Sequence, residues 1–286
     1  MPELPEVETI KLGLSKKIIN KKITDIVIYN KKSFQGNKSN VLQQRVIDVE
    51  RRAKVLRIML ENSQSLLFHL KMTGQLIYID RNKRVAGGHP SHDWHDKLPN
   101  KHTRVQFTFD NGAGLFFNDL RKFGWCKVMN QEEVEKSFGL FGPEPFSNDF
   151  SLKYLLDKAK RYPTRTIKQF LMDQTVVAGI GNIYNDEALF LSKIYPKTKV
   201  SKLTSHEWQK IITNVRKVLT KGIKYGGTTD SDYVDADGKS GGMQNHLNVY
   251  HKTGEKCQSD CGGMIERIVI GGRGTYFCPN CQKEKI

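Results

Sequence analysis

The sequence has no apolar run that approaches the roughly 18 residues of a membrane-spanning helix. Its beginning also lacks the apolar stretch of a secretory signal, so we expect a protein of the reducing cytosol with no membrane partner. Cysteine is scarce: there are five, and four of them lie close to the C-terminus. In a reducing compartment, such a cluster indicates metal binding and not disulfides.

Acidic residues are outnumbered. There are 30 of them against 46 lysines and arginines, which leaves a formal net charge of +16. This excess favours a polyanionic partner such as nucleic acid, although a merely basic, soluble surface is the alternative. The length of 286 residues predicts about two domains, each large enough for its own core.

The first eight residues, Met1–Glu8, hold two prolines and three carboxylates. Apolar residues then recur at helical spacing, which predicts an amphipathic helix. They are Val7, Ile10, Leu14 and Ile18. Pro5 suits the first turn of this helix, because the N–H that proline lacks is not needed there, and Glu6 and Glu8 suit its positive end.

Pro2 has two possible readings. If Met1 is removed, Pro2 becomes a terminal secondary amine, and a terminal amine titrates near about 8. Its neutral form can attack a sugar aldehyde carbon and form a Schiff base. The alternative is an acidic, solvated start of a helix, and this stretch alone does not decide between the two.

Up to about residue 130, short alternating segments separated by turn residues predict an all-β sandwich behind the leading helix. Cys126 is expected to be a small core residue. The expected strands are 23–29, two strands around a basic turn within 46–58, 65–70, and a hairpin of 105–109 and 115–117 around Asp110-Asn111-Gly112.

Residues 80–99 interrupt the pattern with glycines, prolines and charges, and we interpret them as a solvated loop. The segment contains His89, His92 and His95, which could suggest a metal cluster. We favour the loop, because no helical frame fixes these side chains and no thiolate accompanies them.

Beyond the glycine- and proline-containing residues 139–150, which predict a linker, the apolar period becomes helical. Helices are expected after Ser151, from Ile167, after Asn182 and after Thr204. Asn182 follows a glycine turn at a helix start, a position that binds phosphate readily, although a simple turn is the alternative. Residues 226–242 are rich in glycine, serine, threonine and aspartate, which predicts a long loop.

The C-terminal cysteines form two pairs whose spacing predicts a tetrahedral, four-thiolate zinc site of structural type. They are Cys257, Cys261, Cys278 and Cys281. Between the pairs, 265–270 and 275–277 are expected to be strands joined by Gly271-Gly272-Arg273-Gly274. An arginine at such a tip suits a phosphate or a DNA groove, and an exposed turn without a ligand is the alternative.

Seven motifs occur together in the order of one family. They are MPELPEVE, RRAK, HLKMTG, NKHT, NDLRKFG, GIGNIYNDEALF and the four-cysteine hairpin with GGRGTYFCPNC. From residue 2 to about residue 283, the chain resembles the bacterial formamidopyrimidine-DNA glycosylases, which remove oxidised purines in base-excision repair.

The resemblance implies five catalytic residues. Pro2 would be the nucleophile that forms a Schiff base with C1′ of the damaged nucleotide. Glu3 would act as general acid and base in base loss and ring opening, with Glu6 supporting the site. Lys54 would contact phosphate and donate a proton in β-elimination, and Arg273 would serve δ-elimination and phosphate binding.

It also implies five DNA contacts. His102 and Asn182 would bind backbone phosphates. Met72, Arg121 and Phe123 would enter the duplex and fill the space left by the extruded base. Such a wedge is physically reasonable, because a stacked base cannot be reached until the enzyme flips it out and stabilises the gap.

The implied fold is α+β and multi-domain: an N-terminal β-sandwich with a catalytic N-terminal helix, a helix–two-turn–helix domain and a zinc-bound β-hairpin. The expected domains are 1–138 (sandwich), 139–150 (linker), 151–225 (helix–two-turn–helix), 226–248 (lesion-capping loop) and 249–286 (zinc hairpin). We expect one structural Zn²⁺, damaged double-stranded DNA as partner, a monomer, and a place in the bacterial cytosol or nucleoid.

Two features depart from the family pattern. The first cysteine pair is separated by three residues where two are common, which four-thiolate zinc sites tolerate. The capping loop has Asp230-Ser231-Asp232-Tyr233 in place of a Val-Arg-Thr-Tyr run, which puts the preferred lesion in doubt.

Three functions therefore stay open. The first is a glycosylase and lyase for oxidised purines such as 8-oxoguanine and formamidopyrimidines, which Leu4 and the wedge residues favour. The second is an enzyme resembling endonuclease VIII that prefers oxidised pyrimidines. The third is a non-catalytic, zinc-containing DNA-binding protein, against which the presence of Pro2, Glu3 and Lys54 argues.

Overall fold

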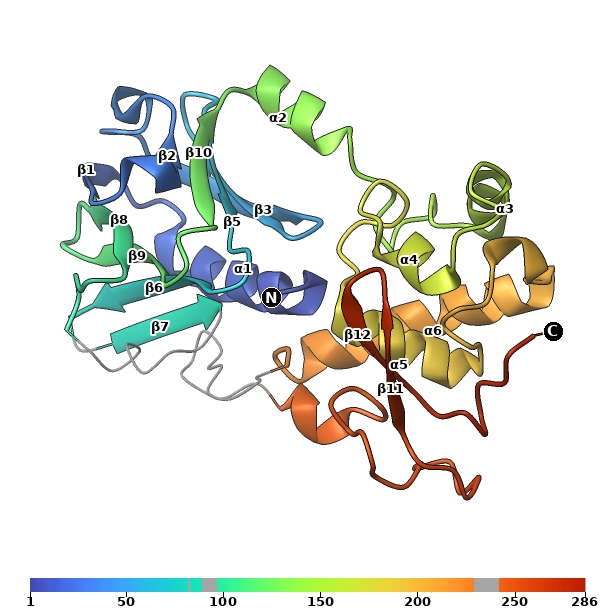
Figure 1. Cartoon of the computed structure of the whole chain (residues 1–286). Helices are drawn as coiled ribbons and strands as arrows, with labels where there is room; N and C mark the ends of the chain where they lie inside the picture. The colour runs from blue at the N-terminus through green and yellow to red at the C-terminus, as the bar shows by residue number, and fades with distance from the viewer. Residues whose placement is uncertain (82, 89–96, 229–241, 286) are drawn as a thin grey trace. The chain divides into compact units, whose positions relative to one another are not determined.

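The structure, a computed structural model of the chain, describes residues 1–81, 83–88, 97–228 and 242–285 (Figure 1). The chain forms two compact units. Unit 1 comprises Met1–Gly139 and Gly222–Gln244, and unit 2 comprises Leu140–Lys221 and Asn245–Ile286. None of the helices in the described ranges has the length and apolarity that a membrane crossing requires.

Unit 1 contains two five-stranded sheets, and their pairings are antiparallel except that of β2 with β10. The first sheet has the order β1 (Ile23–Ile28), β8 (Thr103–Phe109), β9 (Gly114–Asp119), β6 (Gly74–Asp80) and β7 (Lys83–Gly88). The second has the order β2 (Phe34–Gln35), β10 (Trp125–Met129), β5 (Ser65–His69), β4 (Val55–Leu60) and β3 (Val46–Arg52). The 3-10 turns η1 (Lys31–Ser33) and η2 (Lys38–Asn40) flank β2.

The predicted sandwich and its leading helix are confirmed. Phe68 of the second sheet packs edge-on against Phe107 and Phe117 of the first, with ring centroids 5.9 and 5.8 Å apart. Helix α1 (Leu4–Ile18) contacts β3 and β4 of one sheet and β7 of the other. Its predicted apolar residues are all buried, as is Cys126. Helix α1 thereby packs against both sheets.

The interpretation of residues 80–99 as a loop is wrong for 83–88, which form β7 along β6. The glycines in this segment suggested a loop, but they are needed because other parts of the chain pack so closely against the backbone that no side chain fits. A Cβ on Gly87 would lie 2.3 Å from a side-chain carbon of Ile10 in α1, and one on Gly88 would lie 2.3 Å from the Gly74 carbonyl oxygen. His89, His92 and His95 lie outside the described residues.

Unit 2 begins after α2 (Gln131–Phe138), a helix of unit 1 that the sequence analysis did not assign. Its helices are α3 (Leu152–Lys160), α4 (Ile167–Met172), α5 (Asn182–Ser192) and α6 (Ser205–Lys224, which ends in unit 1), with 3-10 turns η4 (Val200–Lys202) and η5 (Met243–His246, shared between the units). Thr204 caps α6 as predicted: its hydroxyl accepts the Glu207 N–H, and the Glu207 carboxylate accepts the Thr204 N–H.

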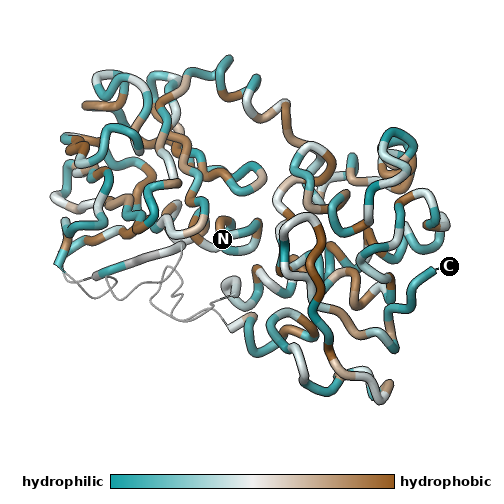
Figure 2. Tube along the Cα trace, in the orientation of Figure 1, coloured by the Kyte–Doolittle hydropathy of each residue, from teal (hydrophilic) through white to brown (hydrophobic). Residues whose placement is uncertain are grey.

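The predicted hairpin is present as β11 (Glu266–Ile270) and β12 (Arg273–Phe277), and Figure 2 colours part of it as hydrophobic. The connection is shorter than expected, because Gly271 and Gly272 alone make the turn, with φ of 56° and 73°. Two positive φ values are what a tight two-residue hairpin needs. Arg273 therefore opens β12, paired with Ile270.

Candidate functional site

The start of α1 holds two buried carboxylates, Glu3 and Glu6, directly behind the buried Pro2. One Glu6 oxygen accepts the Glu3 N–H at 2.8 Å. The other accepts the N–H and hydroxyl of Thr228 at 2.8 and 3.1 Å. Gly227, with a φ of +87°, leaves no space for a side chain, because a Cβ there would lie 2.8 Å from Glu6. Glu6 is thus fixed through both oxygens.

Lys54 lies in the predicted basic turn between β3 and β4 and is only 5% exposed. Arg51, near the end of β3, donates from Nε to Glu8 of α1 at 2.8 Å and from Nη1 to the Ala53 carbonyl in the turn at 2.9 Å. These bonds tie the turn that carries Lys54 to the first turns of the helix behind Pro2.

The Glu8 carboxylate that accepts the hydrogen bond from Arg51 is ionised at neutral pH. Burial raises the pKa of Glu8, but the hydrogen bonds from Arg51 and Lys11 outweigh burial, and the pKa lies below its ordinary value. The ion pair with Arg51 is therefore formed at neutral pH.

His69, at the end of β5, pairs in register with Val55, the residue after Lys54. Its Nδ1 accepts the Lys71 N–H at 3.0 Å. Burial, followed by the charges of Lys71 and Lys54, lowers the pKa of His69 to about 3. His69 is therefore a neutral imidazole beside Lys54. The sequence analysis did not single it out, although it belongs to the HLKMTG motif.

The three predicted wedge residues come together through a buried carboxylate, Asp119. It accepts hydrogen bonds from the Thr73 hydroxyl, the Arg121 N–H at 3.2 Å and the Gly124 N–H at 2.7 Å. The Arg121 N–H also donates to the Thr73 hydroxyl at 3.0 Å. The turn that carries Met72 is thereby bonded to the turn that carries Arg121 and Phe123.

The end of the turn that carries Arg121 and Phe123 is exposed to solvent. Phe123 is 55% exposed, and the Arg121 guanidinium lies 4.8 Å from the centre of its ring. An exposed aromatic ring with a stacked cation suits insertion into a base stack. His102 belongs to the same neighbourhood, because its carbonyl accepts the Asp119 N–H at 2.9 Å.

In unit 2, Asn182 is the first residue of α5, as predicted. Its Nδ2 donates to the carbonyl of Gly274 at 2.9 Å, which places it beside the residue that follows Arg273. The second hydrogen of this amide is chemically available to a phosphate. The Asn182 side chain and the base of the hairpin turn thus form one polar surface.

Arg267, which the sequence analysis missed, belongs to this surface. A Cβ on Gly274 would lie 2.9 Å from two guanidinium nitrogens of Arg267, so its side chain crosses the hairpin directly over Gly274. Arg267 and the exposed Arg273 give the hairpin two cationic groups. A glutamate followed by an arginine in a strand does not by itself indicate that the arginine belongs to a cationic surface.

A buried ion pair anchors the hairpin to the helices. Lys168 of α4 and Asp186 of α5 are both 0% exposed, with Nζ and Oδ1 2.5 Å apart. The other Asp186 oxygen accepts the Tyr276 N–H of β12 at 3.0 Å. Burial raises the pKa of Asp186 to about 7, against the effect of Lys168. Periodicity does not predict this pair.

The four C-terminal cysteines converge, with their sulfur atoms all within 4.8 Å of one another. Two of the separations are 3.8 Å (Cys257 to Cys281) and 3.5 Å (Cys261 to Cys278). Tetrahedral zinc with Zn–S bonds of about 2.3 Å requires sulfurs roughly 3.8 Å apart. The cluster fits one structural zinc ion and leaves no position for a substrate.

The predicted residues are therefore divided between the units. Pro2, Glu3, Glu6 and Lys54, and the wedge with His102, belong to unit 1; Asn182, Arg273 and the zinc cysteines belong to unit 2.

Comparisons with known proteins match each part of the chain. Family models match residues 1–126 (formamidopyrimidine-DNA glycosylase N-terminal domain), 141–234 (the H2TH domain of the same glycosylase) and 254–283 (a zinc finger found in FPG and IleRS). Formamidopyrimidine-DNA glycosylases of Ligilactobacillus salivarius and Desulforamulus reducens are each 39% identical, and each alignment covers 100% of both chains.

Solved structures agree in fold. Lactococcus lactis Fpg bound to DNA with an abasic site has a TM-score of 0.87 and 34% identity, with 99% of this chain and 100% of that chain covered. A variant of it bound to DNA containing Fapy-dG gives the same values. The wild-type protein bound to DNA with an oxidised pyrimidine has a TM-score of 0.85 and 35% identity over the same shares.

Proposed function

The chain belongs to the formamidopyrimidine-DNA glycosylase family, and from this premise we propose that it excises oxidised purines and then cleaves the strand at the abasic site. Membership supports a zinc-finger DNA glycosylase of base-excision repair. The observation that carries the finer proposal is the arrangement around α1: Pro2 stands before two buried carboxylates, and the turn of Lys54 is bonded to the same helix.

The damaged base has to leave the stack first. Met72, Arg121 and Phe123 occupy the gap, with the arginine available to the orphaned partner base. Asp119 and Thr73 hold the two turns together, so the wedge enters the duplex already formed. Preorganisation lowers the free energy needed to open the duplex.

The covalent step then takes place at C1′ of the sugar. The amine of Pro2, freed by removal of Met1, forms an N–C1′ bond while the bond to the base breaks with its electron pair on the base. The amine loses its proton to Glu3, its lone pair forms the iminium, and the C1′–O4′ bond opens, while the departed base takes up a proton from solvent, which balances the charge of the iminium. Glu3 delivers the proton that the sugar oxygen needs. Glu6, fixed by both oxygens, positions Glu3 and exchanges no proton.

Strand cleavage follows from the iminium, which acidifies C2′. Loss of the C2′ proton expels the 3′ phosphate, and a second elimination expels the 5′ phosphate. Lys54 binds a phosphate and supplies a proton in the first elimination, and Arg273 serves the second. His102 and Asn182 bind backbone phosphates, and zinc holds the hairpin closed around its turn.

We further propose that the protein acts as a monomer on damaged double-stranded DNA in the bacterial cytoplasm. Oxidised pyrimidines are the second candidate substrate. This candidate rests on the Lactococcus lactis relative, which has been solved with DNA containing such a base.

Borohydride trapping tests the proposal, because reduction of the iminium leaves a stable protein–DNA bond. The protein processed at Met1 is expected to trap on a duplex with 8-oxoguanine. Trapping on thymine glycol alone would favour the second candidate, and an absence of trapping on both duplexes would refute the catalytic proposal. A Pro2→Gly variant should keep DNA binding and lose most strand cleavage.

A further inference from the structure

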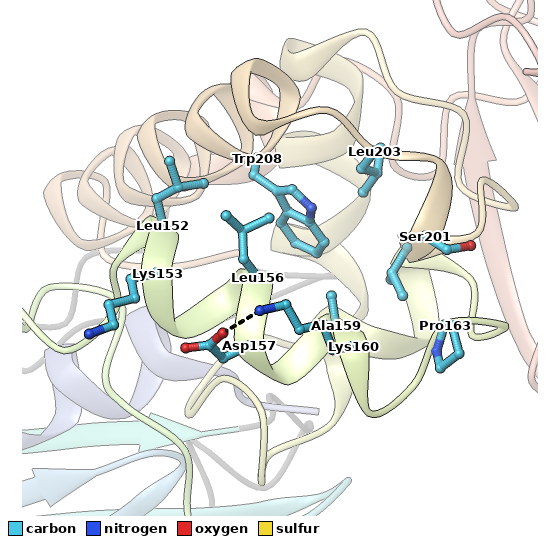
Figure 3. A pocket seen from close by; sticks show the side chains of 11 residues that line it. Leu152, Lys153, Leu156, Asp157, Ala159, Lys160, Pro163, Ser201, Leu203 and Trp208 are labelled. Carbon is cyan, nitrogen blue, oxygen red and sulfur yellow. Dashed lines mark hydrogen bonds and ion pairs between the residues drawn. The ribbon is translucent and has the colours of Figure 1, made fainter.

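Unit 2 contains a pocket that is lined by none of the residues proposed for DNA or zinc (Figure 3). Its volume is about 630 Å³, and it lies among α3, η4 and the start of α6. Binding pockets in proteins typically measure roughly 300–1,000 Å³ and are mostly apolar. Its apolar lining includes Leu152, Leu156, Ala159, Pro163, Leu203 and Trp208.

The pocket has an apolar floor because the apolar face of α3 is wider than the part of it that neighbouring elements pack against. Leu155 and Ala159 are buried, as the helical pattern predicts. Leu152 and Leu156, which belong to the same pattern, are only half-buried and border the pocket. Two leucines one helical turn apart can receive a large apolar side chain from another molecule.

Trp208 adds a directional polar group. The residue is 1% exposed, yet no hydrogen bond between described residues uses its indole N–H. In Figure 3 the nitrogen edge of the indole is turned toward the side of the pocket that Leu203 and Ser201 line. The indole N–H is a donor only, and buried tryptophans usually find an acceptor. A ligand carbonyl or carboxylate would satisfy it.

The charged residues of the lining are Lys153, Asp157 and Lys160, so the rim is positive overall. Lys160 lies 2.9 Å from Asp157, and hydrogen bonding to it, with its charge, lowers the pKa of this carboxyl. The single acid is therefore charged and paired. Lys153 remains as the cation that can meet an incoming carboxylate.

We propose that this pocket binds an acidic peptide segment of a partner protein. A large apolar side chain of the segment inserts between Leu152, Leu156 and Trp208. Its backbone carbonyl or a carboxylate accepts the Trp208 N–H, and a neighbouring Asp or Glu meets Lys153. The apolar floor disfavours nucleic acid as the occupant, because a phosphodiester backbone offers nothing to bury there. The proposal does not depend on the glycosylase chemistry. Binding to the partner would recruit the protein to the place where the partner is located.

Fluorescence anisotropy on the zinc-loaded, full-length protein tests this. The probe is a short fluorescein-labelled peptide with Leu and Phe between Asp and Glu residues. A matched peptide replaces Leu and Phe by Ser and keeps every charge. Both peptides can adhere to a basic protein through charge alone, so only binding that requires the apolar side chains counts for the pocket.

Two variants locate the site. Leu156→Glu places a carboxylate on the floor, and Lys153→Glu reverses the free cation of the rim. Their matched controls are Leu140→Glu, at an apolar residue that is 71% exposed and outside the pocket, and Lys136→Glu, an exposed lysine of α2. Strand cleavage should match the wild type in all four, because none lies in the proposed catalytic or DNA-binding set, and thermal unfolding checks that each variant is folded.

We expect the Leu–Phe peptide to bind the wild type at least about tenfold more tightly than the Ser peptide. Leu156→Glu should weaken it about tenfold and Lys153→Glu several-fold, while both controls bind as the wild type does. Equal binding of the two peptides, unchanged binding by Leu156→Glu, or absence of binding would each overturn the proposal. Displacement of the peptide by undamaged duplex DNA would point to the DNA surface and also overturn it.

Discussion

Glu6 and Thr228 are joined by two hydrogen bonds although they lie 222 positions apart in the chain. The same carboxylate accepts the Glu3 N–H, so one buried side chain connects the start of α1 to the segment that leads into residues 229–241. The family resemblance implies that the capping loop acts on the same damaged nucleotide as Glu3. Glu6 is then the residue that places them relative to each other.

Substitution of this carboxylate tests that role. In Glu6→Gln, one side-chain atom becomes a donor and faces an N–H that it cannot accept. A buried unpaired donor costs about 1–3 kcal/mol, so we expect a loss of stability of that order and slower base excision. Urea unfolding and single-turnover excision measure the two effects. Glu132→Gln, an exposed change on α2, is the control; equal behaviour of the two variants would contradict the assignment.

Asp119 offers a test of the wedge. In Asp119→Asn only one side-chain atom can still accept, so either the Thr73 hydroxyl or the Gly124 N–H loses its acceptor and the turns that carry the wedge are held less firmly. We expect excision of 8-oxoguanine from a duplex to slow by about tenfold or more, because base extrusion requires the wedge. Cleavage at a preformed abasic site should slow much less. Asp110→Asn, in the exposed β8–β9 turn, is the control, and an equal loss on both substrates would rule out a positioning role.

The Lys168–Asp186 pair makes a third prediction. Removal of one partner leaves a buried charge alone, which typically costs about 3–5 kcal/mol, whereas removal of both costs less. Lys168→Met and Asp186→Asn should therefore each destabilise the protein more than the double variant does. A double-mutant cycle by urea unfolding measures the coupling. Additive effects would show that Lys168 and Asp186 are not coupled as a buried ion pair.

The sequence predicted the elements whose signal is local. The alternation in 105–117 gave the β8–β9 hairpin, and the cysteine spacing gave the zinc cluster. It failed at β7, because glycines that usually mark loops are used there for close packing under Ile10, a contact across 77 positions. The partners of Glu6 and Asp119 were likewise invisible, since Thr228 and Thr73 carry no periodic signal. Glycine turns alone pointed to Asn182 and Arg273, but Lys54, His102 and the wedge residues were given roles only through the family resemblance.

His69 provides a pH test that is independent of catalysis. Its pKa in the folded protein is about 3, below the ordinary value of 6.5. Between these values the unfolded chain binds a proton that the folded protein does not, so the free energy of unfolding falls as the pH falls from about 6.5 toward 3. The slope from this one group is at most about 1.4 kcal/mol per pH unit.

In His69→Asn, the amide oxygen can still accept the Lys71 N–H, but nothing titrates there. The stability difference between wild type and variant should therefore be largest near neutral pH and shrink in acid. Urea unfolding of both proteins across this range measures it, and carboxylates such as Glu8 cancel in the difference. A constant difference would mean that the pKa of His69 is the same in the folded and the unfolded protein, so that below pH 6.5 a cation and not a neutral imidazole would lie beside Lys54.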